Sequence, residues 1–148
     1  MTEIKQSNHH AIVPIGMNQY LIIEGNDKRP VFRFDNIISC SAIIFKCQKG
    51  FAGFHYAAGG LKNDCEKYAR AMVEMINDIK FKIGDILWVK CFTPSPQLDC
   101  FGVQDCSDDE ESRISSFFLD HIKVRCYRRV YHIGEVSHSI EWEKDYFD

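Results

Sequence analysis

The chain has 148 residues, 45% of them apolar, which is enough for a single domain with a sizeable core. Its formal net charge of −3, without a basic stripe, argues against nucleic-acid binding as its main role. Residues 1–10 are polar, and no apolar run approaches the roughly 18 residues of a membrane span. We therefore expect one domain over residues 1–148, with residues 1–10 flexible. It would work in the cytoplasm, or be exported to a host cell without a classical signal peptide.

The first half of the chain is predicted to contain only strands. Two short strands are expected over Ala11–Ile15 and Gln19–Ile23. Two longer apolar runs follow, over Phe34–Phe45 and Phe51–Ala58. The polar break Gln48-Lys49-Gly50 between them predicts a hairpin that places a cysteine and a histidine on neighbouring strands.

The second half adds two helical patterns. Asn63 suits the N-cap of the first helix, and Glu66 stands where a capping box has a carboxylate. One face of this helix should pack on the sheet, and it carries Leu61, Cys65, Tyr68, Met72 and Ile76. The later elements are a strand over Ile86–Phe92, a loop over Thr93–Arg113, a helix over Ser112–His121, and a hairpin over Lys123–Trp142 that turns at Gly134. This order predicts an α/β (α+β layered) fold, a mostly antiparallel or mixed β-sheet sandwich flanked by two helices.

Cys40 and His55 are the candidate catalytic pair, because a thiol beside an imidazole is the minimum for thiolate catalysis. Their separation of fifteen residues puts them on one face of an antiparallel hairpin with an even-length turn. A turn centred on Cys47-Gln48 makes them directly opposite, with Cβ atoms about 5 Å apart, and a turn one residue later makes them diagonal, at roughly 7 Å. A turn at Lys49-Gly50 would require a bulge or a bend, which Gly53 could supply.

Short motifs around this hairpin resemble a known family. Gly16-Met17-Asn18-Gln19-Tyr20 looks like a Gly-hydrophobic-x-x-(Tyr/Leu) element, and Ser39-Cys40 before an apolar strand looks like a Ser-Cys segment. With His55 on the next strand, the region from Ile15 to Tyr56 resembles the chemoreceptor glutamine deamidases, the CheD family. The short step from cysteine to histidine also resembles that of the cytotoxic necrotizing factors, which are deamidating toxins with the same Cys-His core.

The resemblance implies a CheD-like deamidase fold and a protein-glutamine deamidase that works through a Cys-His thioester mechanism. Cys40 would be the nucleophile and His55 the base, and no metal or organic cofactor is expected. The partner would be a protein substrate with a reactive glutamine. The chain would act as a bacterial signalling regulator or as a host-directed effector.

The chain departs from the family at the group that orients the histidine. The family has a threonine where this chain has Phe34, which cannot hydrogen-bond an imidazole through its side chain. A backbone carbonyl would then orient the ring, or Asp35 or Asn36 would reach it. Together with Ser39, these residues are the candidates for orienting the histidine or binding the oxyanion.

Other interpretations compete with the deamidase. The domain could be a catalytically silent protein-binding module of the same fold, or a cysteine protease or transglutaminase with the same dyad. The number of cysteines is seven, so at least one is unpaired, and we expect them all to be reduced. A zinc site would have to use Cys91, Cys100 and Cys106 with His121 or His132, a spacing that matches no standard zinc pattern.

Overall fold

The computed structural model describes residues 1–6, 12–25, 30–35, 40–62, 65–94, 107–124, 126–131 and 139–143, with only the backbone at 93–94, 107–111, 128–131 and 139–143. The elements in these residues are β1 (Thr2–Ile4), β2 (Pro14–Ile15), β3 (Gln19–Glu24), β4 (Val31–Asp35), β5 (Ser41–Cys47), β6 (Gly50–Tyr56), α1 (Glu66–Ile83), β7 (Ile86–Pro94), α2 (Ser107–Ile122), β8 (Cys126–Tyr131) and β9 (Ser139–Glu143).

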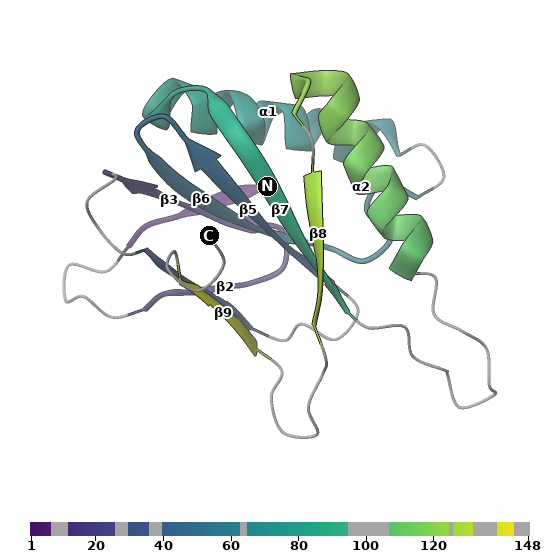
Figure 1. Cartoon of the computed structure of the whole chain (residues 1–148), viewed down its shortest axis with the longest axis horizontal. Coiled ribbons are helices and arrows are strands. Elements are labelled where there is room, and N and C mark those ends of the chain that lie inside the picture. The colour runs from purple at the N-terminus through teal and green to yellow at the C-terminus, as the bar shows by residue number, and fades with distance from the viewer. Residues whose placement is uncertain are drawn as a thin grey trace.

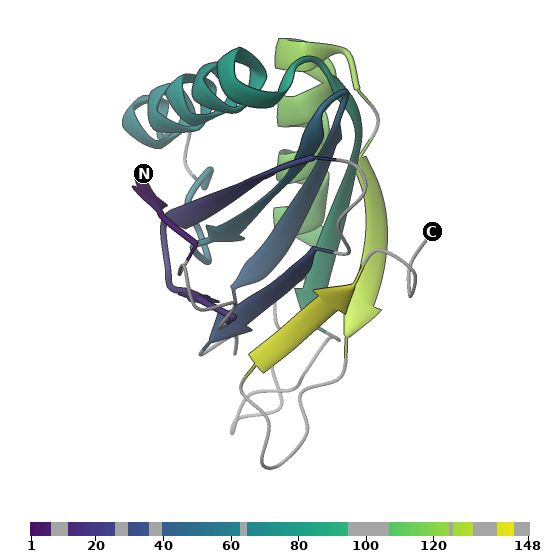
Figure 2. The ribbon, with the colours of Figure 1, turned by 90° about the vertical axis from the view of Figure 1, so that its left-hand side faces the viewer.

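Two sheets and two helices stack as three layers (Figure 1). The larger sheet has the strand order β1-β3-β6-β5-β7-β8, and the smaller one has β2-β4-β9. The helices cover one face of the larger sheet, and the smaller sheet lies against the opposite face (Figure 2). The larger sheet is mixed, because β1 and β8 pair in parallel with their neighbours while the central pairs are antiparallel. The predicted layered α+β class is therefore confirmed at this level.

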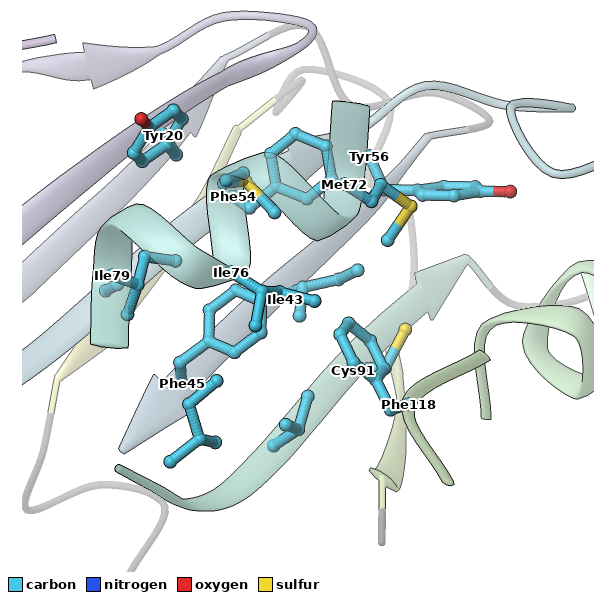
Figure 3. Close-up of a cluster of buried hydrophobic side chains, with 14 of the residues drawn as sticks. Tyr20, Ile43, Phe45, Phe54, Tyr56, Met72, Ile76, Ile79, Cys91 and Phe118 are labelled. Carbon is cyan, nitrogen blue, oxygen red and sulfur yellow. The ribbon is translucent and has the colours of Figure 1, made fainter. Parts of the chain in front are cut away.

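β5 and β6 are buried along almost their whole length, because each has a covered layer on both sides. On the helix side, Ile43 and Phe45 of β5 meet Met72 and Ile76 of α1 (Figure 3). Phe118 of α2 closes the same cluster, with its ring centroid 5.5 Å from that of Phe45. The amphipathic pattern of both helices thus buries one face of each on the sheet.

The opposite face of β5 presents Ala42 and Ile44 to the smaller sheet, where Phe32 and Phe34 of β4 are fully buried. Gly53 of β6 faces the smaller sheet. A Cβ atom there would be 2.8 Å from Cδ1 of Phe32. Gly53 therefore allows close approach between the layers, and the β5–β6 pairing runs past it without a bulge.

The predicted final hairpin is wrong. β8 pairs in parallel with β7 at the edge of the larger sheet, whereas β9 pairs antiparallel with β4 in the smaller one. β4 itself is a further strand that the periodicity did not separate from the run leading to Cys40. Alternation predicts a strand but does not choose its partner, and the proposed turn at Gly134 lies outside the described residues.

The ends of several elements differ from those predicted. α1 begins at Glu66 with Cys65 at the N-cap, and Cys65 is exposed, so its predicted packing on the sheet is wrong. The predicted N-cap at Asn63, which itself lies outside the described residues, is wrong, and Glu66 is the first helical residue instead of the carboxylate of a capping box. α2 begins at Ser107, so the acidic run Asp108–Glu111, predicted within a loop, forms its first turns, where negative charge favours the helix dipole. At the N-terminus, Thr2–Ile4, within the segment expected to be flexible, pairs with β3.

Within the described residues, neither helix is both long enough and apolar enough to cross a lipid bilayer.

Candidate functional site

The register of the β5–β6 hairpin determines how Cys40 and His55 lie. The turn is Gln48-Lys49, and Ala42 stands directly opposite His55. β5 begins at Ser41, and extending its alternation back by one residue puts Cys40 on the face of Ala42 and His55. This register predicts a diagonal relation between the two residues, with roughly 7 Å between their Cβ atoms. Nε2 of His55 has no hydrogen-bond partner among the described residues, Cys40 included, so contact between Sγ and the ring stays a prediction.

The two side chains differ in exposure. Cys40 is partly exposed, at the start of β5. His55 is 1% exposed, between the larger and the smaller sheet. A molecule approaching from solvent would therefore reach the Cys40 thiol first, and the His55 imidazole lies deeper in the protein.

The last residue of β2 and the turn that follows it each form a hydrogen bond with His55. The Nδ1 atom of His55 lies 2.9 Å from the carbonyl oxygen of Ile15. A carbonyl oxygen only accepts hydrogen bonds, so Nδ1 carries the proton and donates it. The backbone N–H of Asn18 in turn donates to the carbonyl of His55 at 2.9 Å. The neutral ring is therefore the tautomer whose Nε2 has a free lone pair.

This Nε2 atom is buried and has no hydrogen-bond partner among the described residues. An unsatisfied buried acceptor of this kind costs about 1–3 kcal/mol. Most buried polar atoms in proteins are satisfied, and a catalytic role is one of the recognised reasons for an exception. Nε2 is the atom that a general base would use.

Burial lowers the pKa of His55 below its ordinary value of 6.5, while the hydrogen bond to Ile15 and the charge of Asp35 act in the opposite direction. The imidazole is therefore neutral at pH 7, as a proton acceptor must be. Asp35 accepts a hydrogen bond from Nε of Arg33 at 3.0 Å. The ring of Phe34 meets His55 edge-on, with centroids 6.3 Å apart.

The orienting group is thus the carbonyl of Ile15, one of the alternatives that the sequence left open. Phe34 packs against the ring, and Asp35 acts on it through its charge. Asn36 and Ser39 lie outside the described residues. Sequence reasoning did not identify Ile15 or Asn18, although both flank or belong to the Gly16–Tyr20 motif, which was the available signal.

A separate groove of about 480 Å³ lies between α1 and α2, on the helix side of the larger sheet. Its lining includes Leu61, Cys65, Phe117 and His121. It does not include Cys40 or His55.

Among the described residues, no three His, Cys, Asp or Glu side chains gather to hold a metal ion. Cys91, considered above as a zinc ligand, is fully buried in the core beneath the helices.

Comparison of the sequence with protein-family models and with curated proteins gives no match.

Proposed function

We propose that the protein is a cysteine-dependent protein-glutamine deamidase in which Cys40 is the nucleophile and His55 the general base. The observation that carries this proposal is the state of His55: its Nδ1–H is bound to Ile15, and its Nε2 is buried and unpartnered. Cys40 directly precedes the strand paired with that of His55, and it is the nucleophile that we assign to Nε2. The resemblance of the Gly16–Tyr20 and Ser39-Cys40 motifs to the CheD family supports the same activity.

In the proposed reaction, Nε2 of His55 takes the proton from Sγ of Cys40, and the thiolate attacks the carboxamide carbon of a glutamine side chain. Backbone N–H groups at Cys40 and a neighbouring residue would stabilise the oxyanion. The imidazolium returns its proton to the leaving nitrogen, and ammonia departs as the thioester forms. Water then gives one proton to Nε2 and attacks the thioester. The products are a glutamate side chain and the restored thiol, with no oxidant or reductant consumed.

The partial exposure of Cys40 and the burial of His55 suit a substrate side chain that projects from another protein. A protease or a transglutaminase would use the same dyad with a different acyl group or acceptor. The burial of His55 also favours a second candidate, a catalytically silent protein-binding module, because a core histidine held by a backbone carbonyl would look the same.

Thiol reactivity separates an active dyad from a structural pair without knowledge of the substrate. Cys65 is more exposed than Cys40, so accessibility alone would make it react faster, and it is a stringent internal reference. A free thiol is only a few per cent ionised at pH 7. If His55 activates Cys40, iodoacetamide should label Cys40 faster than Cys65, and His55→Gln should slow Cys40 by about ten-fold.

Activity is then tested on a library of synthetic glutamine peptides by ammonia release and by mass spectrometry of the amide-to-acid conversion. Wild type and Cys65→Ser should release ammonia, and Cys40→Ser and His55→Gln should not. Labelling of Cys40 that is slower than that of Cys65 and unchanged in His55→Gln would reject the dyad and favour the binding module. Fast labelling without ammonia release would reject the deamidase and leave a protease as the next activity to assay.

A further inference from the structure

The phenol of Tyr68 in α1 connects two segments that meet at His55. Its hydroxyl donates to Oδ1 of Asn18 at 2.8 Å and accepts from the backbone N–H of Ala57 at 3.1 Å. Asn18 belongs to the β2–β3 turn, and Ala57 directly follows β6. One side chain therefore ties the turn to the end of the strand that carries the histidine.

The turn that Tyr68 holds is a compact unit. The N–H of Gln19 donates to the carbonyl of Gly16 at 3.0 Å, and the side chain of Gln19 accepts from the N–H of Gly16 at 2.9 Å. Asn18 has a φ of 62°, in the left-handed region that asparagine and glycine tolerate best. Because the turn is bonded within itself, fixing Asn18 also fixes Ile15, whose carbonyl accepts the Nδ1–H of His55.

The position of the Tyr68 ring does not depend on its hydroxyl. The ring packs edge-on against Tyr56, with centroids 5.6 Å apart. It also lies directly over Gly60, where an added Cβ would be 2.5 Å from two ring atoms. Replacing tyrosine with phenylalanine therefore keeps the ring packing and removes the hydroxyl, and with it the hydrogen bonds to Asn18 and Ala57.

We propose that Tyr68 is a positioning residue for His55: its hydroxyl, through Asn18, keeps the Ile15 carbonyl on Nδ1 and so directs Nε2 toward the nucleophile. This inference rests on the proposed function for its catalytic meaning. That the Tyr68 hydroxyl on α1 sets the tautomer of His55 in β6 can be tested without any substrate.

The test is nitrogen NMR of the His55 ring together with iodoacetamide labelling of Cys40, in wild type, Tyr68→Phe and Asn18→Gly. Asn18→Gly removes the acceptor but tolerates the positive φ. Tyr20→Phe is the matched control, because it removes another hydroxyl that contacts α1, the one that donates to Asp78 at 2.6 Å. Wild type and the control should show a single tautomer protonated at Nδ1.

Tyr68→Phe and Asn18→Gly should each give mixed tautomers and lower the labelling rate of Cys40 by roughly 3- to 30-fold, since small misplacements of a catalytic group are costly. The double variant should be no worse than Tyr68→Phe alone, because Asn18→Gly breaks a hydrogen bond that Tyr68→Phe has already removed. In any activity assay, kcat should fall while KM stays unchanged.

A His55 ring that keeps its single Nδ1-protonated tautomer in folded Tyr68→Phe would overturn the inference, as would an equal effect from Tyr20→Phe. Mixed tautomers in Tyr68→Phe combined with no ammonia release by wild type would uphold the positioning role and reject the deamidase. The two proposals therefore fail by different measurements.

Discussion

Replacing Gly53 with alanine should force apart the two sheets that enclose His55. The added Cβ would lie 2.8 Å from Cδ1 of Phe32 and 3.2 Å from Cδ1 of Ile15. Comfortable contacts between carbon atoms begin near 3.5 Å. The smaller sheet must therefore move away locally by roughly 0.3–0.7 Å, or the buried ring of Phe32 must leave its rotamer.

Either response should change the free energy of unfolding and the geometry around His55 by a measurable amount. Overpacking of this kind costs about 1–3 kcal/mol of unfolding free energy. If the smaller sheet moves as one body, the bond between Nδ1 of His55 and the Ile15 carbonyl lengthens from 2.9 Å to about 3.2–3.6 Å, the weak limit of a hydrogen bond. Gly53→Ala should therefore lower stability and reduce the labelling rate of Cys40 together.

Urea unfolding provides the assay, with Phe32→Val as the second arm of a double-mutant cycle. Valine lacks the δ-carbons that the new methyl group would meet, so the combined variant should lose less free energy than the sum of the single variants, by about 1 kcal/mol or more. A Gly53→Ala variant within about 0.5 kcal/mol of wild type, or additive losses in the double variant, would refute the close approach of the two sheets at this position.

Two further predictions concern the core and the pH dependence of stability. Met72 is fully buried, so Met72→Asp should lose about 3 kcal/mol or more, whereas Met72→Leu should lose less than about 1.5 kcal/mol; unchanged thermal stability of the aspartate variant would count against this packing. The pKa of His55 is lowered below 6.5 in the folded chain, so the unfolded chain binds a proton at higher pH than the folded chain does. The free energy of unfolding should therefore fall as the pH drops from about 6.5 toward the folded pKa, by up to about 1.4 kcal/mol per pH unit. His55→Gln should lack this loss, and parallel curves for the two proteins would contradict it. The lowered pKa values of Glu3 and Asp78 place their own loss of stability at more acidic pH.

Much of the fold followed from local patterns in the sequence. The helical spacing of Met72 and Ile76 specifies one buried face of α1, and the continuous apolar runs of β5 and β6 indicate strands buried on both faces, as the structure shows. The partners of β8 and β9 could not be predicted in this way. Pairing between strands depends on contacts far apart in sequence, and β4, the partner of β9, was not separated from the run leading to Cys40.

The candidate side chains of the site could be chosen from the sequence, but the backbone group that orients the histidine could not. The parity of Cys40 and His55 is a property of hairpins, and the observed turn at Gln48-Lys49 selects the diagonal arrangement. The carbonyl that orients the ring belongs to Ile15, and every residue except proline carries the same backbone groups, so side-chain chemistry gives no sign of it. The sequence therefore identifies the candidate side chains better than the backbone group that orients the imidazole.

The bond between Ile15 and His55 joins residues forty positions apart, and the sheet that presents Ile15 is completed by β9, the last described strand. Pairings of such long range form late in folding, because the entropy of closing the chain must be overcome first. The imidazole would thus remain unaligned in a nascent chain until Ser139–Glu143 has been synthesised and docked. Any reactivity that depends on the alignment of His55 would be withheld during synthesis and would appear only with the finished fold.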